Sequence, residues 1–500
     1  MLTWVLSALL VLLGLCWVRL RWLHVRGYWA RRGVPHEPPH PLLGSLTFLM
    51  RDCPAIWFRD MRSRFPGAPY VGFWSLWRPG LLVHSPDLAR RILVTDFHCF
   101  CDRHISADHD SVGSKSLLLA NNPFWSSVRR QLSSTFSAAK MKYYQDIITL
   151  KSKEVVKRFE HERKKEKAID IRLAFSDFST DAISAALLGV GSESLLGGAS
   201  PLRFVTREFN RSTLYRGVSW TSIFFAPDIA RIFRFKFFPS EALTPLRKLL
   251  LVAGSLRGGG VGSGVQVARD LLDSLIKLKQ ENNDKQDVSS DTSLAQAAIL
   301  LQGGYETTAL TLTFATYELA HHPDVQEKLY EELSEARKNV DEKEFYTTVL
   351  RNLTYLNCCI KETLRKYSTM GWLDRVARRE YRVDERVTLA PGAPVYVNAA
   401  GMHWDPRYFP RPELFLPERF EPPHAPQPFT YLPFGEGPRQ CIGKRFGQQA
   451  LRSVLATLVL AARLLPVPGA PPPGSFRYEP AGVLLAPDQV LLVQVEPRRV

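Results

Sequence analysis

Residues 434–447 read FGEGPRQCIGKRFG and place a single cysteine, Cys441, in a segment rich in glycine and basic residues. The stretch that follows, residues 448–460 (QQALRSVLATLVL), has the apolar spacing of a helix. Cys441 is therefore predicted to lie in a glycine-shaped turn just before a helix. Backbone N–H groups, the positive end of that helix and three nearby cations would favour its thiolate form; the cations are Arg439, Lys444 and Arg445.

A thiolate on a rigid loop can be a nucleophile or a metal ligand, and the sequence favours the ligand. A nucleophilic cysteine needs a histidine close by as its base, and no motif points to one. Tetrahedral zinc needs three more ligands, and the seven cysteines show neither paired C-x-x-C motifs nor a disulfide spacing. One thiolate alone fits the axial position of a haem iron, where it pushes electron density toward O–O cleavage.

Residues 293–321 (SLAQAAILLQGGYETTALTLTFATYELAH) are predicted to form a long helix, apolar on most faces, at the centre of a large domain. Gly303 and Gly304 interrupt this helix, and each costs roughly 1 kcal/mol relative to alanine. Adjacent glycines let another group approach the backbone, and Glu306 beside Thr307 forms a plausible pair for proton delivery. A packing notch, with the threonine bonding back to a helix carbonyl, accounts for the same residues equally well.

Glu362 and Arg365 stand three residues apart on a predicted helix and so share one face. Such a pair alone is usually a solvated surface bridge worth under about 1 kcal/mol. The segment PERF at residues 417–420 adds a second arginine, Arg419. A carboxylate held by two arginines can lock a loop in place, but the sequence leaves open whether the three residues meet.

Residues 1–18 carry no charged side chain and are just long enough for a membrane-spanning helix, which needs roughly 20 residues. Five arginines follow before the first acidic residue, Glu37, so the chain after the helix is expected to stay in the cytosol. A cleaved signal peptide fits less well, because no basic segment precedes the apolar run and arginines occupy the expected cleavage site. Residues 19–45 are predicted to be a basic, proline-rich linker.

Residues 46–500 are predicted to form one mainly helical domain with small β-sheets, since no long polar linker or internal repeat divides them. One hairpin is expected at residues 70–84 with its turn at Pro79-Gly80, and another at residues 381–398 around Pro391-Gly392. Two stretches are predicted to be loops, the glycine-dense residues 257–264 and the polar residues 280–291.

The composition limits the class of protein. Hydrophobic residues make up 45% of the chain and charged residues 23%, which excludes wholesale disorder and a coiled coil. The formal net charge of +16 suits nucleic acid, an anionic membrane surface or an acidic partner protein. Cysteines that are few and unpatterned favour a reducing compartment.

The segment around Cys441, with Phe434, Arg439 and Gly443 in their places, resembles the haem-binding signature of the cytochrome P-450 family. Three further motifs resemble those of the same family. They are the oxygen-activating motif in residues 303–308 (GGYETT), the structural triad Glu362, Arg365 and Arg419, and the haem-propionate motif Trp125 with Arg129. Residues 28–35 (YWARRGVP) and 373–377 (LDRVA) look most like insect microsomal members that oxidise foreign compounds.

This resemblance implies the cytochrome P-450 fold after a single N-terminal transmembrane helix, with a role for each matching residue. Cys441 would be the fifth ligand to the haem iron, with Phe434 covering the proximal face and Gly443 shaping the loop. The residues expected to hold the haem propionates are Trp125, Arg129, Arg375 and Arg439.

On the other side of the haem, Gly303 and Gly304 would let the long helix pass over the oxygen-binding face. Thr307, with Glu306 behind it, would supply protons. Glu362, Arg365 and Arg419 would hold the fold rather than perform chemistry. The loop at residues 103–121 would sample the substrate, and the aromatic pair Phe224 and Phe225 suggests an apolar pocket.

The function implied is that of a monooxygenase anchored in the endoplasmic reticulum membrane, with residues 1–18 as anchor, 19–45 as linker and 46–500 as a cytosolic haem-thiolate domain. It would insert one oxygen atom from O2 into small apolar substrates such as plant toxins, insecticides or endogenous lipophiles. Electrons would come from NADPH through NADPH-cytochrome reductase, with cytochrome b5 as a second donor. Membrane lipid is an expected partner and nucleic acid is not.

Two other functions stay open at this point. A haem-thiolate isomerase or dehydratase acting on peroxides would need no external electrons, and an anchored binding protein would use Cys441 only structurally. The sequence also departs from the family pattern. Ser368 and Thr369 stand where the family usually has a proline pair, and residues 257–264 are glycine-dense where helical sequence is usual.

Overall fold

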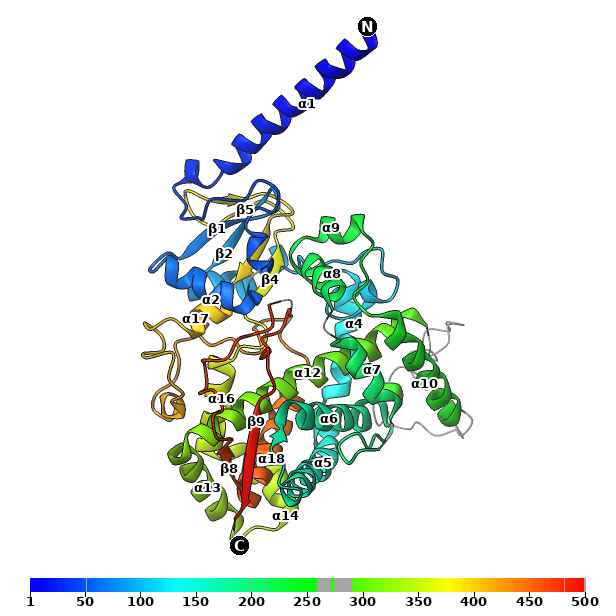
Figure 1. The fold of residues 1–500 in the computed structure, drawn as a ribbon, viewed down its shortest axis with the longest axis vertical. Helices are drawn as coiled ribbons and strands as arrows, with labels where there is room; N and C mark the ends of the chain where they lie inside the picture. The colour runs from blue at the N-terminus through cyan, green and yellow to red at the C-terminus, as the bar shows by residue number, and fades with distance from the viewer. Residues whose placement is uncertain are drawn as a thin grey trace.

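The computed structural model is mainly helical, with a four-stranded sheet on the side from which the N-terminal helix extends and a three-stranded sheet toward the opposite end of the body (Figure 1). It describes residues 1–50, 52–198, 200–211, 213–258, 271–273, 290–480 and 482–498. Both the mainly helical class and the small sheets predicted from the sequence are confirmed.

The helices, in chain order, are α1 (Leu2–Arg26), α2 (Pro54–Arg64), α3 (Pro86–Arg90), α4 (Phe124–Ser133), α5 (Ala138–Lys164), α6 (Ile171–Ile183), α7 (Pro201–Phe209), α8 (Leu214–Phe225), α9 (Pro227–Ile232), α10 (Ser240–Gly258), α12 (Asp291–His321), α13 (Pro323–Arg337), α14 (Glu342–Glu344), α15 (Leu350–Asn352), α16 (Thr354–Lys366), α17 (Ala399–His403) and α18 (Lys444–Ala461). The strands are β1 (Tyr70–Ser75), β2 (Arg78–Val83), β3 (Ile169–Asp170), β4 (Leu373–Val376), β5 (Tyr381–Arg382), β6 (Thr388–Leu389), β7 (Pro394–Val397), β8 (Ala462–Pro466) and β9 (Leu492–Pro497).

The long helix α12 crosses the middle of the body and is buried along most of its length (Figure 1). It begins two residues before the predicted start, because the Ser290 side chain caps it by accepting a hydrogen bond from the Ser293 backbone N–H. It ends at His321, as the sequence predicts, and Pro323 opens α13. Helices α6, α16 and α18 pack around it, so the centre of α12 lies in the main hydrophobic core.

The first predicted hairpin exists, but its turn is not at Pro79-Gly80. Strands β1 and β2 pair from Tyr70 opposite Val83 to Ser75 opposite Arg78, so residues 76–77 make the turn. Gly80 lies inside β2, where the ring of Phe73 leaves no room for a side chain. The glycine serves close packing rather than the turn, which is why its sequence signal misleads.

The second predicted hairpin also turns elsewhere. Strands β5 and β6 pair directly, and the Asp384 carboxylate accepts hydrogen bonds from the backbone N–H groups of Arg386 and Val387 within their turn. Pro391-Gly392 instead connects β6 to β7. Strand β7 pairs in parallel with β2 and antiparallel with β4, which completes a four-stranded sheet.

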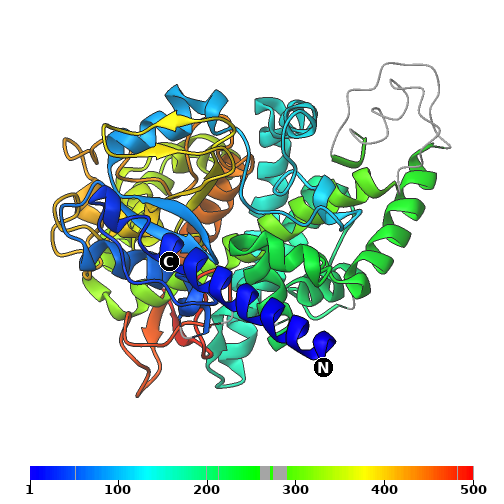
Figure 2. The same ribbon diagram turned by 90° about the horizontal axis from the view of Figure 1, so that it is seen from above.

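The N-terminal helix α1 projects from the body with its apolar side chains exposed, and it is long and apolar enough to cross a membrane (Figures 1 and 2). The helix continues to Arg26, beyond the residues 1–18 that are expected to form the anchor. Within the predicted linker at 19–45, Trp29 is buried and donates from Nε1 to the Phe73 carbonyl at 3.1 Å. Trp74 likewise donates to the Val25 carbonyl at 3.1 Å, so this segment is docked on the sheet.

The glycine-dense and polar stretches fall mostly beyond what the structure describes. Arg257 and Gly258 end α10, whereas Ser290 and Asp291 cap and begin α12. The rest of the two loops predicted at 257–264 and 280–291 lies outside the described residues.

Candidate functional site

The loop that carries Cys441 is shaped by glycines and leads directly into α18, as predicted. Gly435 and Gly437 have positive φ angles of 68° and 76°, which favour glycine. Any side chain on Gly437 would also meet the Leu93 carbonyl. The Cys441 backbone N–H donates to the Phe434 carbonyl at 2.9 Å, which closes the loop on itself. The thiol is therefore presented from a tight, defined turn.

Cys441 is the one cysteine of the catalytic body whose side chain is exposed, and all seven cysteines lie in described residues. Cys16 is exposed as well, but on the projecting helix α1. The five buried cysteines are Cys53, Cys99, Cys101, Cys358 and Cys359. Within the described residues, no three His, Cys, Asp or Glu side chains group as a metal site. An external metal would thus find a single sulfur ligand here, which excludes a structural zinc site in this part of the chain.

As predicted, a backbone N–H group and Lys444 favour the thiolate form of Cys441, but they are not the only influence on its pKa. Although solvent reaches the residue, the surrounding protein disfavours a charged sulfur, and this desolvation raises the pKa of the Cys441 thiol above its usual value. The Gly443 backbone N–H, Arg129 and Lys444 oppose that rise without cancelling it. A metal ion deprotonates the thiol that coordinates it, so an iron bound to the sulfur would supply the missing stabilisation.

Two fully buried arginines near this loop have unsatisfied donors. Arg375 donates from Nη1 to the Asp374 carbonyl at 2.7 Å, but its Nε has no partner. Arg439 bonds to the backbone carbonyls of Cys101 and Ala120, but its Nη1 has none. Burial, together with repulsion from Arg103, lowers the pKa of each guanidinium to about 9. Such groups call for an anionic partner, because unpaired buried charge is costly.

Arg129 and Arg103 complete a cluster of four arginines beside Cys441, since both influence the charge on its sulfur. The aspartates that face the cluster are Asp374, bound by Arg103 at 2.7 Å, and Asp102, 3.9 Å from Arg439. Positive charge is therefore in excess. The Trp125 ring lies beneath the Arg439 guanidinium, 4.2 Å from centroid to Cζ. The two carboxylates of a haem would fit this set of donors, and the assignment of Trp125, Arg129, Arg375 and Arg439 to them stays a prediction.

The two glycines of α12 face different surroundings. A side chain on Gly303 would meet open space, whereas one on Gly304 would meet Ile183 of α6. Gly304 thus permits the close packing of α6 against α12, and Gly303 leaves the backbone open to a ligand. The Thr307 hydroxyl donates to the Gly303 carbonyl at 2.6 Å, so it lies at the same opening. The structure shows both parts of the packing explanation, the contact of α6 at Gly304 and the Thr307 hydroxyl bonding back to the helix, whereas ligand approach at Gly303 stays a prediction.

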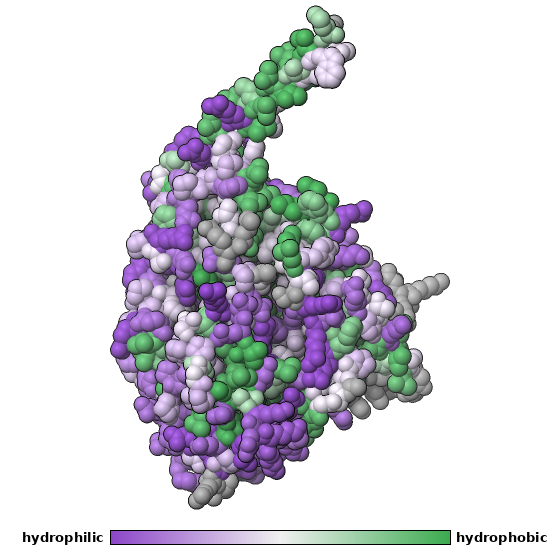
Figure 3. Space-filling view, viewed as in Figure 1, coloured by the Kyte–Doolittle hydropathy of each residue, from purple (hydrophilic) through white to green (hydrophobic). Residues whose placement is uncertain are grey.

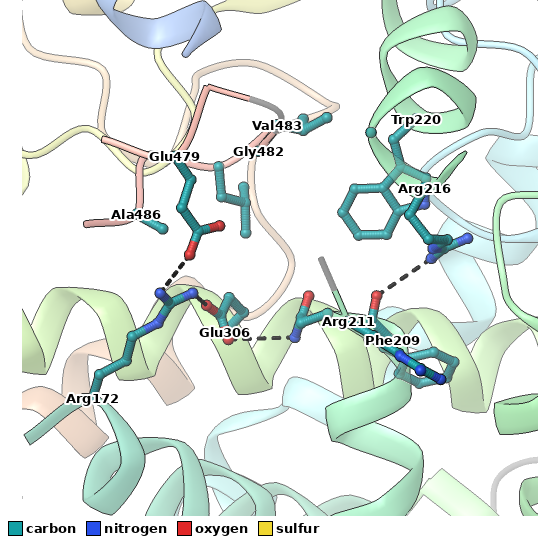
Figure 4. Close-up of a pocket in the computed structure, with 13 residues that line it drawn as sticks. Arg172, Phe209, Arg211, Arg216, Trp220, Glu306, Glu479, Gly482, Val483 and Ala486 are labelled. Carbon is teal, nitrogen blue, oxygen red and sulfur yellow. Dashed lines mark hydrogen bonds and ion pairs between the residues drawn. The ribbon is translucent and has the colours of Figure 1, made fainter. Parts of the chain in front are cut away.

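Glu306 is buried and held by residues from other helices. Its carboxylate accepts from Arg172 of α6 at 3.0 Å and from the Asn210 side chain at 3.3 Å (Figure 4). Arg172 also binds Glu479 at 2.7 Å, so it bridges two carboxylates. Burial raises the pKa of Glu306, and Arg172 opposes the rise. These groups line one pocket, which also includes Trp220 of α8 and Leu484 of the C-terminal loop. Glu306 therefore connects the inside of α12 with a pocket that opens outward.

The structure brings Glu362, Arg365 and Arg419 together in the interior. Arg365 makes a bidentate pair with Glu362 at 2.7 and 2.8 Å, and Arg419 donates to the same carboxylate at 3.1 Å. The side chains of Glu362 and Arg365 are 0% exposed. Arg365 also donates to the backbone carbonyls of Pro412 and Leu414. The triad therefore ties α16 to the irregular segment that precedes the Cys441 loop.

The loop at 103–121 and the pair Phe224 and Phe225, which are expected to contact substrate, lie in different surroundings. The loop at 103–121 is tied to α12, since the Gln296 side chain accepts from the Leu117 N–H at 3.0 Å and donates to the Lys115 carbonyl at 2.6 Å. Phe224 and Phe225, in contrast, are packed in the core. Phe225 lies 5.0 Å from Trp372 and 5.7 Å from Tyr396 between ring centroids, and the apolar pocket expected at this pair stays a prediction.

The sequence does not identify Arg103 as a member of the arginine cluster, nor Arg172 as the partner of Glu306 and Glu479. Arg103 stands at the start of a predicted loop, and no local motif marks Arg172 or Glu479. Their partners are far away in the chain, with Arg103 binding Asp374 and Arg172 binding Glu306. Contacts over such separations leave no pattern in one sequence.

Comparison with known proteins agrees with this geometry. A model of the family described as cytochrome P-450 matches residues 34–493. Cytochromes P-450 6k1 and 6l1 of Blattella germanica are each 33% identical, over 472 and 470 residues, and the alignments cover 89% and 92% of this chain and 88% and 91% of the relatives. Cytochrome P-450 6a9 of Drosophila melanogaster is 31% identical over 91% of both chains. The exposed cysteine in a glycine-rich loop and the four arginines beside it agree with the family match and with these relatives. The chain therefore belongs to the cytochrome P-450 family and is a haem-thiolate monooxygenase.

Proposed function

We propose that the protein oxidises small apolar molecules in the endoplasmic reticulum membrane, using O2 and electrons passed from NADPH by a flavoprotein reductase. The observation that carries this proposal is the exposed Cys441 sulfur beside a buried cluster with excess positive charge. A haem bound there by Cys441 and the arginines supplies the oxidising chemistry. The protein supplies placement, a dry environment and protons.

The Glu306 side chain is suited to bring protons toward Thr307. It is buried beside Thr307 in α12, and its carboxylate reaches a pocket that opens outward. Arg172 holds the carboxylate in place while burial keeps its proton affinity high. The Thr307 hydroxyl, bonded to the Gly303 carbonyl, sits where α12 is open to a ligand.

The reaction proposed is RH + O2 + NADPH + H⁺ giving ROH, H2O and NADP⁺, where RH is an apolar organic substrate. The test combines the purified full-length chain, the reductase, NADPH and a panel of hydrocarbons under ¹⁸O2. We expect products that carry one ¹⁸O atom, and NADPH itself should reduce the haem in the presence of the reductase. A haem reduced by dithionite but never by NADPH and reductase would contradict the proposal and favour an isomerase or dehydratase that needs no electrons.

Replacing Thr307 with alanine should uncouple NADPH use from oxidation. The hydroxyl that passes protons is lost, so a several-fold larger share of the NADPH consumed should appear as hydrogen peroxide. Peroxide per NADPH is the measurement. Thr311→Ala is the matched control, because Thr311 makes the same bond one turn later, to the Thr307 carbonyl at 2.8 Å. Equal coupling in the two variants would contradict a proton role for Thr307.

An acidic reductase would meet basic side chains near Cys441. Arg130 of α4 and Arg445 of α18 are exposed, and Arg129 and Lys444 beside them act electrostatically on the Cys441 sulfur. The surplus of Lys and Arg over Asp and Glu in the whole chain adds to this attraction. Reductase binding should therefore weaken as salt concentration rises, and cytochrome b5 would compete for the same face.

The membrane attachment is proposed to rest on α1, with a second contact at α8 and α9. Exposed apolar side chains lie along α1 and over α8 and α9 (Figure 3). On the latter pair they include Leu214, Tyr215, Val218, Ile232 and Phe233. Basic residues after the apolar run of α1 orient the catalytic body toward the cytosol.

Deleting residues 2–23 should weaken membrane binding without loss of haem. The deletion removes the exposed apolar part of α1 but keeps Val25 and Trp29, which are buried in the body. The measurement is the share of protein extracted from membranes by high salt, together with haem content. Secretion of an N-terminally shortened native chain would instead show that α1 is a signal peptide.

A further inference from the structure

His403, the last residue of α17, is fully buried and uses each of its side-chain nitrogens and its carbonyl. Its carbonyl accepts from Arg365 Nη1 at 2.9 Å. Its Nε2 accepts from the Leu432 backbone N–H at 2.8 Å. Its Nδ1 lies 2.7 Å from the Ser368 hydroxyl. One residue thus joins the triad, the end of α16 and the segment that leads into the Cys441 loop.

These contacts fix the tautomer of the ring. A backbone N–H can only donate, so Nε2 must carry no proton and Nδ1 must carry it. Nδ1–H therefore donates to the Ser368 hydroxyl, whose own hydrogen is directed to the carbonyl of Leu364 at 3.3 Å or of Arg365 at 3.4 Å. Burial and the neighbouring Arg365 lower the pKa of His403 to about 3, so the ring is neutral at physiological pH.

Leu432 begins the turn that presents the sulfur. Its carbonyl accepts from the Gly435 N–H at 3.1 Å, and two residues along the chain the Phe434 carbonyl accepts from the Cys441 N–H at 2.9 Å. The bond from the Leu432 N–H to His403 is thus a contact that fixes the start of the loop from outside, beside the bond from the Tyr431 hydroxyl to the Lys361 carbonyl at 3.0 Å. On its other side His403 is held through Arg365, which is itself locked by Glu362.

We propose that His403 is a positioning residue that couples the Glu362, Arg365 and Arg419 triad to the Cys441 loop, and that Ser368, by accepting from Nδ1–H, holds the ring in the orientation that this coupling needs. The proposal rests on Cys441 being the haem ligand. It also gives a reason for a departure from the family pattern, since a proline at position 368 has no hydroxyl to accept from Nδ1. Ser368 and His403 therefore act together in this chain.

The test compares how fast the reduced, carbon monoxide-bound holoenzyme loses its thiolate spectrum in mild denaturant. In His403→Leu the Leu432 N–H loses its acceptor, and we expect loss of the thiolate band about tenfold faster than in the native chain. His403→Gln, whose side-chain oxygen can accept that bond, should restore part of the difference. Ser368→Ala should give a smaller acceleration in the same direction.

Two controls separate positioning from general destabilisation. His84→Leu removes a histidine that is equally buried but has no partner on either ring nitrogen, and Ser152→Ala removes a buried hydroxyl that bonds only within α5. Each variant's midpoint of urea unfolding is measured alongside. The rate at which the thiolate band is lost is compared with the fall in the urea midpoint of each variant. The same relation between the two quantities in His403→Leu and His84→Leu would overturn the proposal.

Hydrogen exchange of the Leu432 amide in the holoenzyme gives a second readout that needs no catalysis. The amide should be protected in the native chain and exchange about tenfold faster in Ser368→Ala, which keeps the fold and would remain informative if His403→Leu failed to fold. Unchanged protection of Leu432 in Ser368→Ala would contradict the role of Ser368. Absence of a thiolate band in the native chain would instead contradict the haem ligand itself, so the two failures are distinguishable.

Discussion

Replacing Cys441 with alanine should abolish the thiolate spectrum of the reduced, carbon monoxide-bound protein and its oxidising activity. No other cysteine of the catalytic body is exposed, so no second sulfur can replace it. The arginine cluster stays intact in this variant, and some haem should still bind through its carboxylates. The measurement is the carbon monoxide difference spectrum per mole of haem.

Cys358→Ala is the matched control for this prediction. Cys358 is buried in a small cluster with Phe409 and Phe420, and burial raises the pKa of its thiol to about 11. Its loss should reduce stability modestly and leave the thiolate spectrum unchanged. A normal thiolate spectrum in Cys441→Ala would refute the ligand assignment.

Replacing Glu362 with alanine should destabilise the fold more than almost any other single change. Arg365 would be left fully buried without its carboxylate, and breaking a buried ion pair in this way costs about 3–5 kcal/mol. The Leu416 backbone N–H, which donates to Glu362 at 2.9 Å, would lose its partner too. We expect a large fall in the free energy of unfolding, measured by urea denaturation, together with low yields of haem-loaded protein.

Glu335→Ala tests whether burial is the cause of that loss. Glu335 pairs with Lys338 at the same spacing of three residues, but both side chains are more than half exposed. Its removal should change the free energy of unfolding by about 0.5 kcal/mol or less. Similar losses in the two variants would mean that the triad does not hold the structure together.

The sequence alone predicts the elements whose signals are local. The apolar pattern of 293–321 predicts α12, and the glycines around Cys441 predict its turn, because helix periodicity and backbone freedom act within a few residues. The triad could be named from its motif. That its three members meet, however, depends on the packing of α16 against a distant segment.

The predictions that differ from the structure concern residues whose type fits more than one structural role. Pro79-Gly80 signals a turn, yet Gly80 lies within a strand because Phe73 packs against its backbone. Pro391-Gly392 does form a turn, but it joins β6 to β7, which belong to different sheets. Trp29 stands in a segment that looks like a linker and is buried by the sheet. The cations near Cys441 lower the pKa of its thiol as expected, but the sequence does not reveal the desolvation that opposes them. In each case the surrounding tertiary structure determines the conformation or the pKa of the residue, and a single sequence does not reveal those surroundings.

X-ray absorption at the iron edge of the purified, haem-loaded chain tests the central claim most directly, because it counts the atoms bound to the metal. We predict four porphyrin nitrogens and one sulfur neighbour, with the sulfur lost in Cys441→Ala. An iron with only nitrogen and oxygen neighbours in the native chain would contradict the account.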